Sequence, residues 1–251
     1  MDVVYLTLFF IFGLIFGSFF NVVGLRVPKK ESIVYPNSHC TKCNHELSWF
    51  ENIPVLSYIF LRGKCRNCKS KISPIYPVME LITGFLYTFT FAQLGWQVEL
   101  VAGLLLVSLL VIITVSDLAY MIIPDKVLLF FLVLIVIMRI VEPLDSWWDA
   151  LLAAAVGFGI LYLLAVVSKG GMGGGDIKLF FVLGLFLGTK ATLMTLFLAS
   201  VIGAVFGLVQ IIIKGYEKRR PIPFGPFIAI GAIISYFYTD AIINWYIGTF
   251  F

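Results

Sequence analysis

The chain has 251 residues, of which 61% are hydrophobic and only 13% are charged, and it carries a net charge of +4. Its mean hydropathy of +1.02 leaves too little polar surface for a water-soluble globule of this size. We therefore expect an all-α polytopic membrane protein, and we attribute the small positive charge to membrane topology rather than to nucleic-acid binding. A transmembrane β-barrel is disfavoured because the apolar runs are continuous rather than alternating.

Eight apolar segments predict about eight transmembrane helices in the lipid bilayer. Most reach the ~20 residues that cross about 30 Å of hydrocarbon, but the sixth is too short and is expected to begin below the membrane surface. The segments are Val3–Val23, Tyr76–Leu94, Val98–Ser116, Lys126–Val141, Trp148–Val167, Ile177–Gly188, Ala191–Ile213 and Ile222–Tyr238. Small residues four apart, which favour close helix contact, occur at Gly13 and Gly17, Gly184 and Gly188, and Gly203 and Gly207.

The basic residues predict the orientation of these helices. With the N-terminus outside, all 18 Lys and Arg residues except Arg139 and Lys190 fall on the cytoplasmic side. These include Lys218, Arg219 and Arg220 in the last inner loop. The opposite orientation would place nearly all of them outside, so we expect an outside N-terminus.

The first inner loop carries all four cysteines of the chain, Cys40, Cys43, Cys65 and Cys68, as two C-x2-C pairs. Such pairs typically place four thiolates around one structural Zn²⁺. Two disulfides are disfavoured because thiols stay reduced in a cytoplasmic loop, and a catalytic metal because four cysteines leave no open position. His39 and His45 flank the first pair and are expected to be surface or supporting residues rather than ligands.

Two acidic residues lie at the ends of apolar segments. Asp117 closes one segment, and Asp176 follows the glycine run GGMGGGDIK, which spans 170–178. A carboxylate near lipid is costly and therefore indicates a functional site. The topology puts both acids at the cytoplasmic face, where one ionised carboxylate could deprotonate a water while its protonated partner donates to a peptide carbonyl.

The glycines before Asp176 are expected to allow positive φ and the close approach of an extended peptide, which makes Gly173, Gly174 and Gly175 candidates for a substrate-binding region. The alternative is that Asp176 only places a carboxylate at the positive end of a helix dipole.

Six motifs occur in order along nearly the whole chain. They are GSFFNVVGLRVP (17–28), WFENIPVLSYIFLRGKCRNC (49–68), SPIYPVMELITG (73–84), SDLAYMIIPD (116–125), GMGGGDIK (171–178) and PIPFGPFIAIGA (221–232). Together they resemble the type IV prepilin peptidases, bifunctional leader peptidases and N-methyltransferases of the bacterial inner membrane, which are related in catalytic motif to the GxGD aspartyl proteases.

The resemblance implies that Asp117 and Asp176 are the catalytic pair and that the substrate is a type IV prepilin or pseudopilin. Cleavage would follow a glycine at the cytoplasmic face, and the new N-terminus would be methylated with S-adenosylmethionine. Asp125 matches a recurrent acid of the family but is expected to cap the next helix. Lys178 is either an interfacial anchor or shapes the field around the acid, and Ala119 departs from relatives that carry a further acid there.

No glycine-rich dinucleotide-binding fingerprint is present, so methyl transfer is assigned by analogy to the inner loop and adjoining helices. Glu51, which could hold an amine or the sulfonium, and Gly63, which permits close approach, are the candidates, with ordinary loop roles as the alternative.

We accordingly expect a first transmembrane helix at 1–25, a cytoplasmic zinc-binding and methyltransferase region at 26–75, and a transmembrane aspartyl peptidase domain at 76–251. Two alternatives remain open. One is a zinc-knuckle membrane scaffold or assembly factor without catalysis, which leaves the two acids unexplained. The other is a peptidase that lacks methyltransferase activity.

Overall fold

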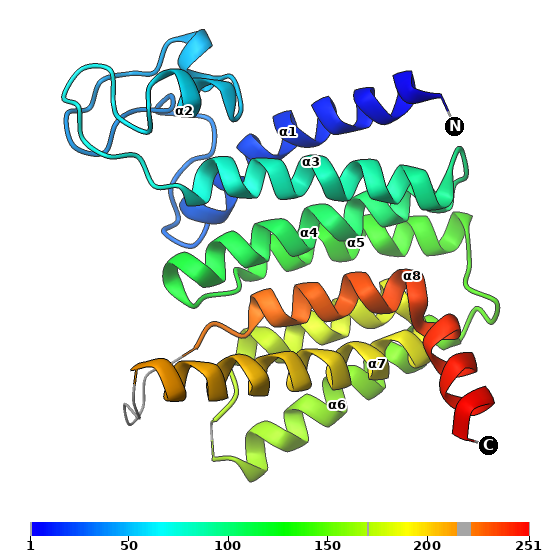
Figure 1. Ribbon diagram of the computed structural model, residues 1–251. Helices are drawn as coiled ribbons and strands as arrows, with labels where there is room; N and C mark the ends of the chain where they lie inside the picture. The colour runs from blue at the N-terminus through cyan, green and yellow to red at the C-terminus, as the bar shows by residue number, and fades with distance from the viewer. Residues whose placement is uncertain (1, 170, 215–221, 251) are drawn as a thin grey trace. The chain divides into compact units, whose positions relative to one another are not determined.

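The computed structural model describes residues 2–169, 171–214 and 222–250 (Figure 1). Gly170, Lys218, Arg219, Arg220 and Pro221, which entered the sequence analysis, lie outside these ranges. The described residues form eight α-helices and one 3-10 helix, with no strand among them, so the all-helical prediction is confirmed. The chain divides into two compact units, Met1–Ala119 and Tyr120–Phe251. The division into functional regions at residues 25 and 75 stays a prediction.

Within the described part of the chain, six helices are long and apolar enough to cross a membrane. They are α1 (Val3–Arg26), α3 (Ile75–Leu94), α4 (Glu99–Tyr120), α6 (Asp149–Val167), α7 (Gly174–Lys214) and α8 (Gly225–Phe250). The equally apolar α5 (Asp125–Val141) has 17 residues. Each of the eight predicted segments overlaps a helix, but the sixth and seventh both belong to α7, and the last corresponds to α8, which begins three residues later than predicted and continues to residue 250. The multi-pass architecture is therefore confirmed, with fewer separate helices than segments.

In the first unit, α1 packs against α3 through the predicted glycine face. A Cβ atom at Gly13 would lie 2.6 Å from Gly84 Cα, and one at Gly17 would lie 2.9 Å from Glu80 Cα. Real Cβ atoms do not approach so closely, so both positions require glycine. α4 joins α3 through a hydrogen bond of 2.8 Å between the hydroxyls of Tyr87 and Ser108.

In the second unit, α6 and α8 pack against α7. Gly184 of α7 lies directly against the backbone of Ala153 and Ala154 in α6, as its small size predicted. The Gly203 and Gly207 pair does not make such a contact. A Cβ atom at Gly203 would meet only aromatic side chains at 3.3 Å, and one at Gly207 would meet a side-chain carbon at 3.9 Å, so α8 does not need glycine there to approach.

A break at Gly188, where φ is 73° and ψ is 173°, divides α7 into a short first part and a long second part. Arg139 of α5 donates to the last carbonyls of the first part, from Nε to Leu185 O at 3.1 Å and from Nη2 to Phe186 O at 2.6 Å. Asp149 of α6 accepts from the amide and hydroxyl of Thr189, which opens the second part. A cation thus satisfies the exposed carbonyls of one helix end and an anion the amide of the next.

Candidate functional site

The four cysteines lie on two turns with the same backbone path. The Cys40 amide donates to His45 O at 2.9 Å, and the Cys65 amide donates to Ser70 O at 2.8 Å. The residue after each second cysteine, Asn44 (φ 53°) or Lys69 (φ 59°), has left-handed backbone geometry that reverses the chain. The C-x2-C spacing therefore produces two equivalent knuckles.

The sulfur atoms of the two knuckles converge on one point. All four lie within 4.8 Å of one another, with Cys40 and Cys68 at 3.8 Å and Cys43 and Cys65 at 3.9 Å. Tetrahedral coordination with metal–sulfur bonds of about 2.3 Å separates the sulfur atoms by about 3.8 Å. All four are free cysteines rather than disulfides. The set therefore fits a single metal ion with a closed coordination sphere.

Local hydrogen bonds favour the thiolate form of two of the four cysteines, Cys40 and Cys68. The backbone amides of Lys42 and Cys43 lower the pKa of Cys40 to about 6, with help from the Ser70 hydroxyl. The Ser70 hydroxyl and amide also lower the pKa of Cys68. For Cys43 the His45 amide acts in the lowering direction, but burial and the neighbouring thiols outweigh it and raise the pKa to about 11. Because the thiolate is the ligand form, a bound cation would offset this cost.

The two histidines point elsewhere. His39 Nδ1 lies 2.9 Å from Asn37 O, and His45 Nε2 lies 3.3 Å from Glu51 Oε2. Neither belongs to the cluster of sulfur ligands.

Glu51 lies in η1 (Trp49–Asn52) and is 5% exposed. Burial acts to raise its pKa, but the hydrogen bond from the Ser48 amide at 2.9 Å and the contact with His45 outweigh burial and hold the pKa below its ordinary value. Its Oε1 atom has no hydrogen-bond partner within the described part of the chain. The side chain thus ties η1 to the first knuckle.

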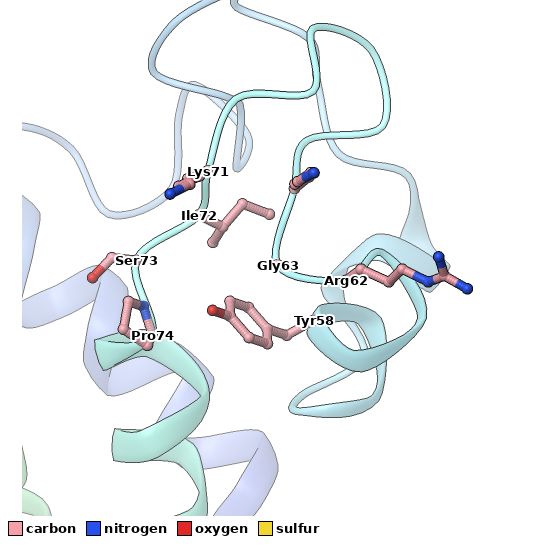
Figure 2. Close-up of a pocket in the computed structure, with 8 residues that line it drawn as sticks. Tyr58, Arg62, Gly63, Lys71, Ile72, Ser73 and Pro74 are labelled. Carbon is pink, nitrogen blue, oxygen red and sulfur yellow. The ribbon is translucent and has the colours of Figure 1, made fainter.

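Gly63 lines a pocket of about 440 Å³ (Figure 2). The pocket is formed in part by Tyr58 of α2 (Leu56–Phe60) and by the residues that follow this helix. Its φ of 64° and the 2.9 Å that would separate a Cβ atom from the Tyr58 ring both require glycine. Figure 2 shows the Tyr58 ring in the space between Gly63 and Pro74. The lining residues are Tyr58, Arg62, Gly63, Lys64, Lys71, Ile72, Ser73 and Pro74. The pocket has three cations and no acid, and Glu51 does not line it.

Asp117 belongs to the first unit, where it lies in the last turn of α4 and is 6% exposed. The helix continues to Tyr120, four residues beyond the end of the predicted apolar segment at Ser116. The carboxylate is therefore held inside a helix rather than in the loop that follows.

Asp176 belongs to the second unit and lies in the first turn of α7, half-buried. The expectation of positive φ before it is wrong for the described glycines, since none of 171 and 173–175 has positive φ. Gly174 and Gly175 instead form the start of the helix. What requires small residues is close packing: a Cβ atom would lie 2.9 Å from Asp176 Oδ2 at Gly173, and 2.8 Å from Ile123 Cβ at Gly175.

Asp125 does not cap a helix as expected. It is the first residue of α5, whose N-cap is Pro124, and no side chain caps that end. Both Asp125 carboxylate oxygens instead accept hydrogen bonds of 2.8 Å from Lys178 Nζ. This ion pair, which no local sequence pattern indicates, ties the start of α5 to the beginning of α7, two residues from Asp176.

These features define a class of protein: a multi-pass helical membrane protein with a loop whose four cysteines could hold a metal ion and with acidic residues at the ends of membrane helices. The chain matches the bacterial peptidase A24 N-terminal domain over residues 11–94 and the type IV leader peptidase family over residues 104–208. It therefore belongs to the type IV leader peptidase family, whose members are aspartic peptidases, and is an enzyme of that family.

Three curated relatives illustrate the similarity, and each is named prepilin leader peptidase/N-methyltransferase. The protein from Bacillus subtilis is 43% identical over 242 residues, which cover 96% of this chain and 98% of the relative. Those from Aeromonas salmonicida and Pseudomonas aeruginosa are 35% and 34% identical, covering 98% and 94% of this chain and 94% and 91% of the relatives. No solved structure matches the chain.

Proposed function

We propose that this protein removes the basic leader peptide from type IV prepilins or pseudopilins and methylates the N-terminus that cleavage exposes. The observation that carries the proposal is the 43% identity, over nearly the full length of both chains, to an enzyme named for these two activities. The enzyme would lie in the bacterial inner membrane with its N-terminus outside. The six apolar helices and the distribution of basic residues support this placement.

Asp117 and Asp176 are proposed as the catalytic pair. Each is a carboxylate at one end of an apolar helix, α4 or α7, and both fall within the region that matches the leader peptidase family. The ionised carboxylate takes a proton from water, whose oxygen adds to the peptide carbonyl, while the other carboxylic acid protonates the carbonyl oxygen. Collapse of the tetrahedral intermediate breaks the C–N bond, and a proton passes to the leaving amine.

Lys178, two residues after Asp176, places a positive charge close in sequence to the proposed pair. The Asp125 carboxylate engages Lys178 through both oxygens at 2.8 Å and offsets that charge. Asp125 is therefore proposed to support the site electrostatically rather than to take part in proton transfer.

The loop between α1 and α3 is proposed to hold both cofactors. Cys40, Cys43, Cys65 and Cys68 would bind a structural Zn²⁺, for which four sulfur ligands at tetrahedral spacing are suited. S-adenosylmethionine, which supplies the methyl group when bound, is proposed to occupy the pocket beside Gly63. Lys64 and Lys71 match its carboxylate, and the Tyr58 ring offers a surface for stacking its base. The pocket has no acid for the sulfonium charge.

The test is incubation of the purified enzyme in detergent with a prepilin and S-adenosylmethionine, followed by mass analysis of the product. We expect loss of the leader and the added mass of one methyl group. An unmethylated cleaved product would favour the peptidase-only alternative, and an unprocessed substrate would favour the scaffold. Asp117→Asn and Asp176→Asn should abolish cleavage while the protein remains folded in the membrane.

A further inference from the structure

Apolar side chains are exposed along η1 and α2, in the loop between α1 and α3 that also carries the four cysteines. Trp49 and Phe60 are each 80% exposed, Ile59 is 61% exposed and Leu56 is 51% exposed. The last three have the spacing that places residues on one face of a helix. Phe85 of the spanning helix α3 is exposed to a similar extent, 63%. Scattered exposed apolar residues are ordinary, but a cluster of this kind indicates an interaction surface.

A hydrogen bond sets the depth of this cluster relative to α3. The Val55 amide, immediately before α2, donates to Glu80 Oε2 at 2.7 Å, and Glu80 is 7% exposed. Glu80 lies in the second turn of α3, about 7.5 Å along the helix axis from the first residue of α3 at 1.5 Å per residue. The start of α2 is therefore held at the level of the second turn of α3, a membrane-spanning helix. Figure 1 shows α2 beside the first turns of α3.

The backbone at this attachment is held in an unusual conformation. Val55 has φ 61° and ψ −51°, which is a rare state for a β-branched residue. Such a state persists only where the surroundings hold it. Two hydrogen bonds flank it, a local one from the Leu56 amide to Pro54 O at 2.6 Å and the bond from the Val55 amide to Glu80. The position of α2 is thus specified rather than incidental.

The charge around the cluster favours an anionic surface. Residues 52–71 contain no acidic residue, and their basic residues are Arg62, Lys64, Arg66, Lys69 and Lys71. A short apolar face followed by basic residues is typical of segments that lie in the headgroup region of anionic membranes.

We propose that residues 49–61, the interfacial segment, insert their apolar side chains into the lipid headgroup region at the membrane face where α3 begins. The partner is the anionic lipid surface itself. The Tyr58 ring points from α2 toward Gly63 (Figure 2). Tyr58 therefore belongs to the pocket and is not one of the side chains proposed to insert into lipid. If the pocket holds the methyl donor, which rests on the proposed function, the interfacial segment keeps it at the membrane surface. The insertion itself does not depend on that function.

The experiment uses the full chain with Trp49 as its sole tryptophan, obtained by replacing Trp96, Trp147, Trp148 and Trp245 with Phe. The purified protein is reconstituted in vesicles of phosphatidylcholine and phosphatidylglycerol. Quenching of its fluorescence is compared between acyl chains brominated near the headgroup and acrylamide in the water. The matched control carries Trp49→Phe and Lys42→Trp, which moves the fluorophore to an exposed position between the cysteines of the first knuckle.

We expect brominated lipid to reduce the Trp49 emission about twofold and acrylamide to have little effect, with the reverse for the control. Quenching of Trp49 by acrylamide alone would overturn the proposal. Protection from both agents would also overturn it, because protein rather than lipid would then cover the segment. If the four replacements impair folding, 5-fluorotryptophan in the native chain, assigned with Trp49→Phe, gives the same comparison with lipid-soluble and water-soluble paramagnetic agents.

Discussion

Asp149 holds Thr189 through two hydrogen bonds, accepting from its amide at 3.0 Å and from its hydroxyl at 2.6 Å. This carboxylate, on the first residue of α6, serves as the cap of the second part of α7. A side chain 40 positions away in sequence thus replaces the local residue that ordinarily caps a helix.

Replacing Asp149 with Ala should lower the free energy of unfolding by about 1 to 2 kcal/mol, because the first amide of this helix loses its acceptor. Asp149→Asn keeps one acceptor oxygen and should cost less. Thermal unfolding in detergent, followed by circular dichroism, measures the effect. The exposed Glu142→Gln serves as control, and an equal loss in that variant would show that Asp149 is not acting as a cap.

Gly188→Ala should destabilise the protein by about 1 to 3 kcal/mol, since a side chain is strained at its positive φ. The new Cβ atom would also lie 2.5 Å from Asp149 Oδ2. Gly159→Ala is the matched control, because Gly159 is helical and has open space where its Cβ would be. That variant should be neutral or slightly stabilising. Similar unfolding temperatures for the two variants would contradict the described break.

Measuring the metal content of variants shows whether the cysteines or the nearby histidines are the metal ligands. The purified protein should contain one zinc ion per chain, and Cys65→Ser should lose it because a buried ligand is removed. Removal of zinc should speed amide hydrogen exchange in the knuckles and leave the apolar helices protected. His39→Ala should retain the metal. Loss of zinc from that variant to the same extent as from Cys65→Ser would contradict the four-sulfur site.

The stability of the loop should depend on pH through Glu51. Its pKa is lower in the folded protein than the ordinary 4.5, so its ionised form stabilises the fold above that value. This contribution declines as the pH falls through the folded-state pKa. Hydrogen exchange should show faster opening of the loop in Glu51→Gln than in the wild type at pH 7, with the difference shrinking below about pH 4.5. Glu46→Gln, at an exposed position, should show no such difference.

The helices and the convergence of the four cysteines follow from local patterns. A run of about 20 apolar residues specifies a spanning helix wherever its neighbours lie, and the C-x2-C spacing determines a turn that aims two sulfur atoms at one ion. The location of the helices and the convergence of Cys40, Cys43, Cys65 and Cys68 were therefore predictable from the sequence.

The features that the sequence analysis missed depend on contacts between distant residues. The pairs of Asp125 with Lys178 and of Val55 with Glu80 join residues 53 and 25 positions apart, and no local pattern marks either one. The start of α7 inside the glycine run opposes local propensity, which disfavours helical glycine. Packing of Gly175 against Ile123 overrides that preference.

The rate of leader cleavage by Asp117→Asn, Asp176→Asn and the double variant shows whether the two carboxylates form one catalytic pair. If the two carboxylates act as a unit, each single variant should lose nearly all activity and the double variant little more, because the effects of such residues are not additive. Asp125→Asn, which lies outside the proposed pair, should retain most of the activity. Substantial cleavage by either single variant of Asp117 or Asp176, with correct folding and insertion, would show that these two residues are not the catalytic pair.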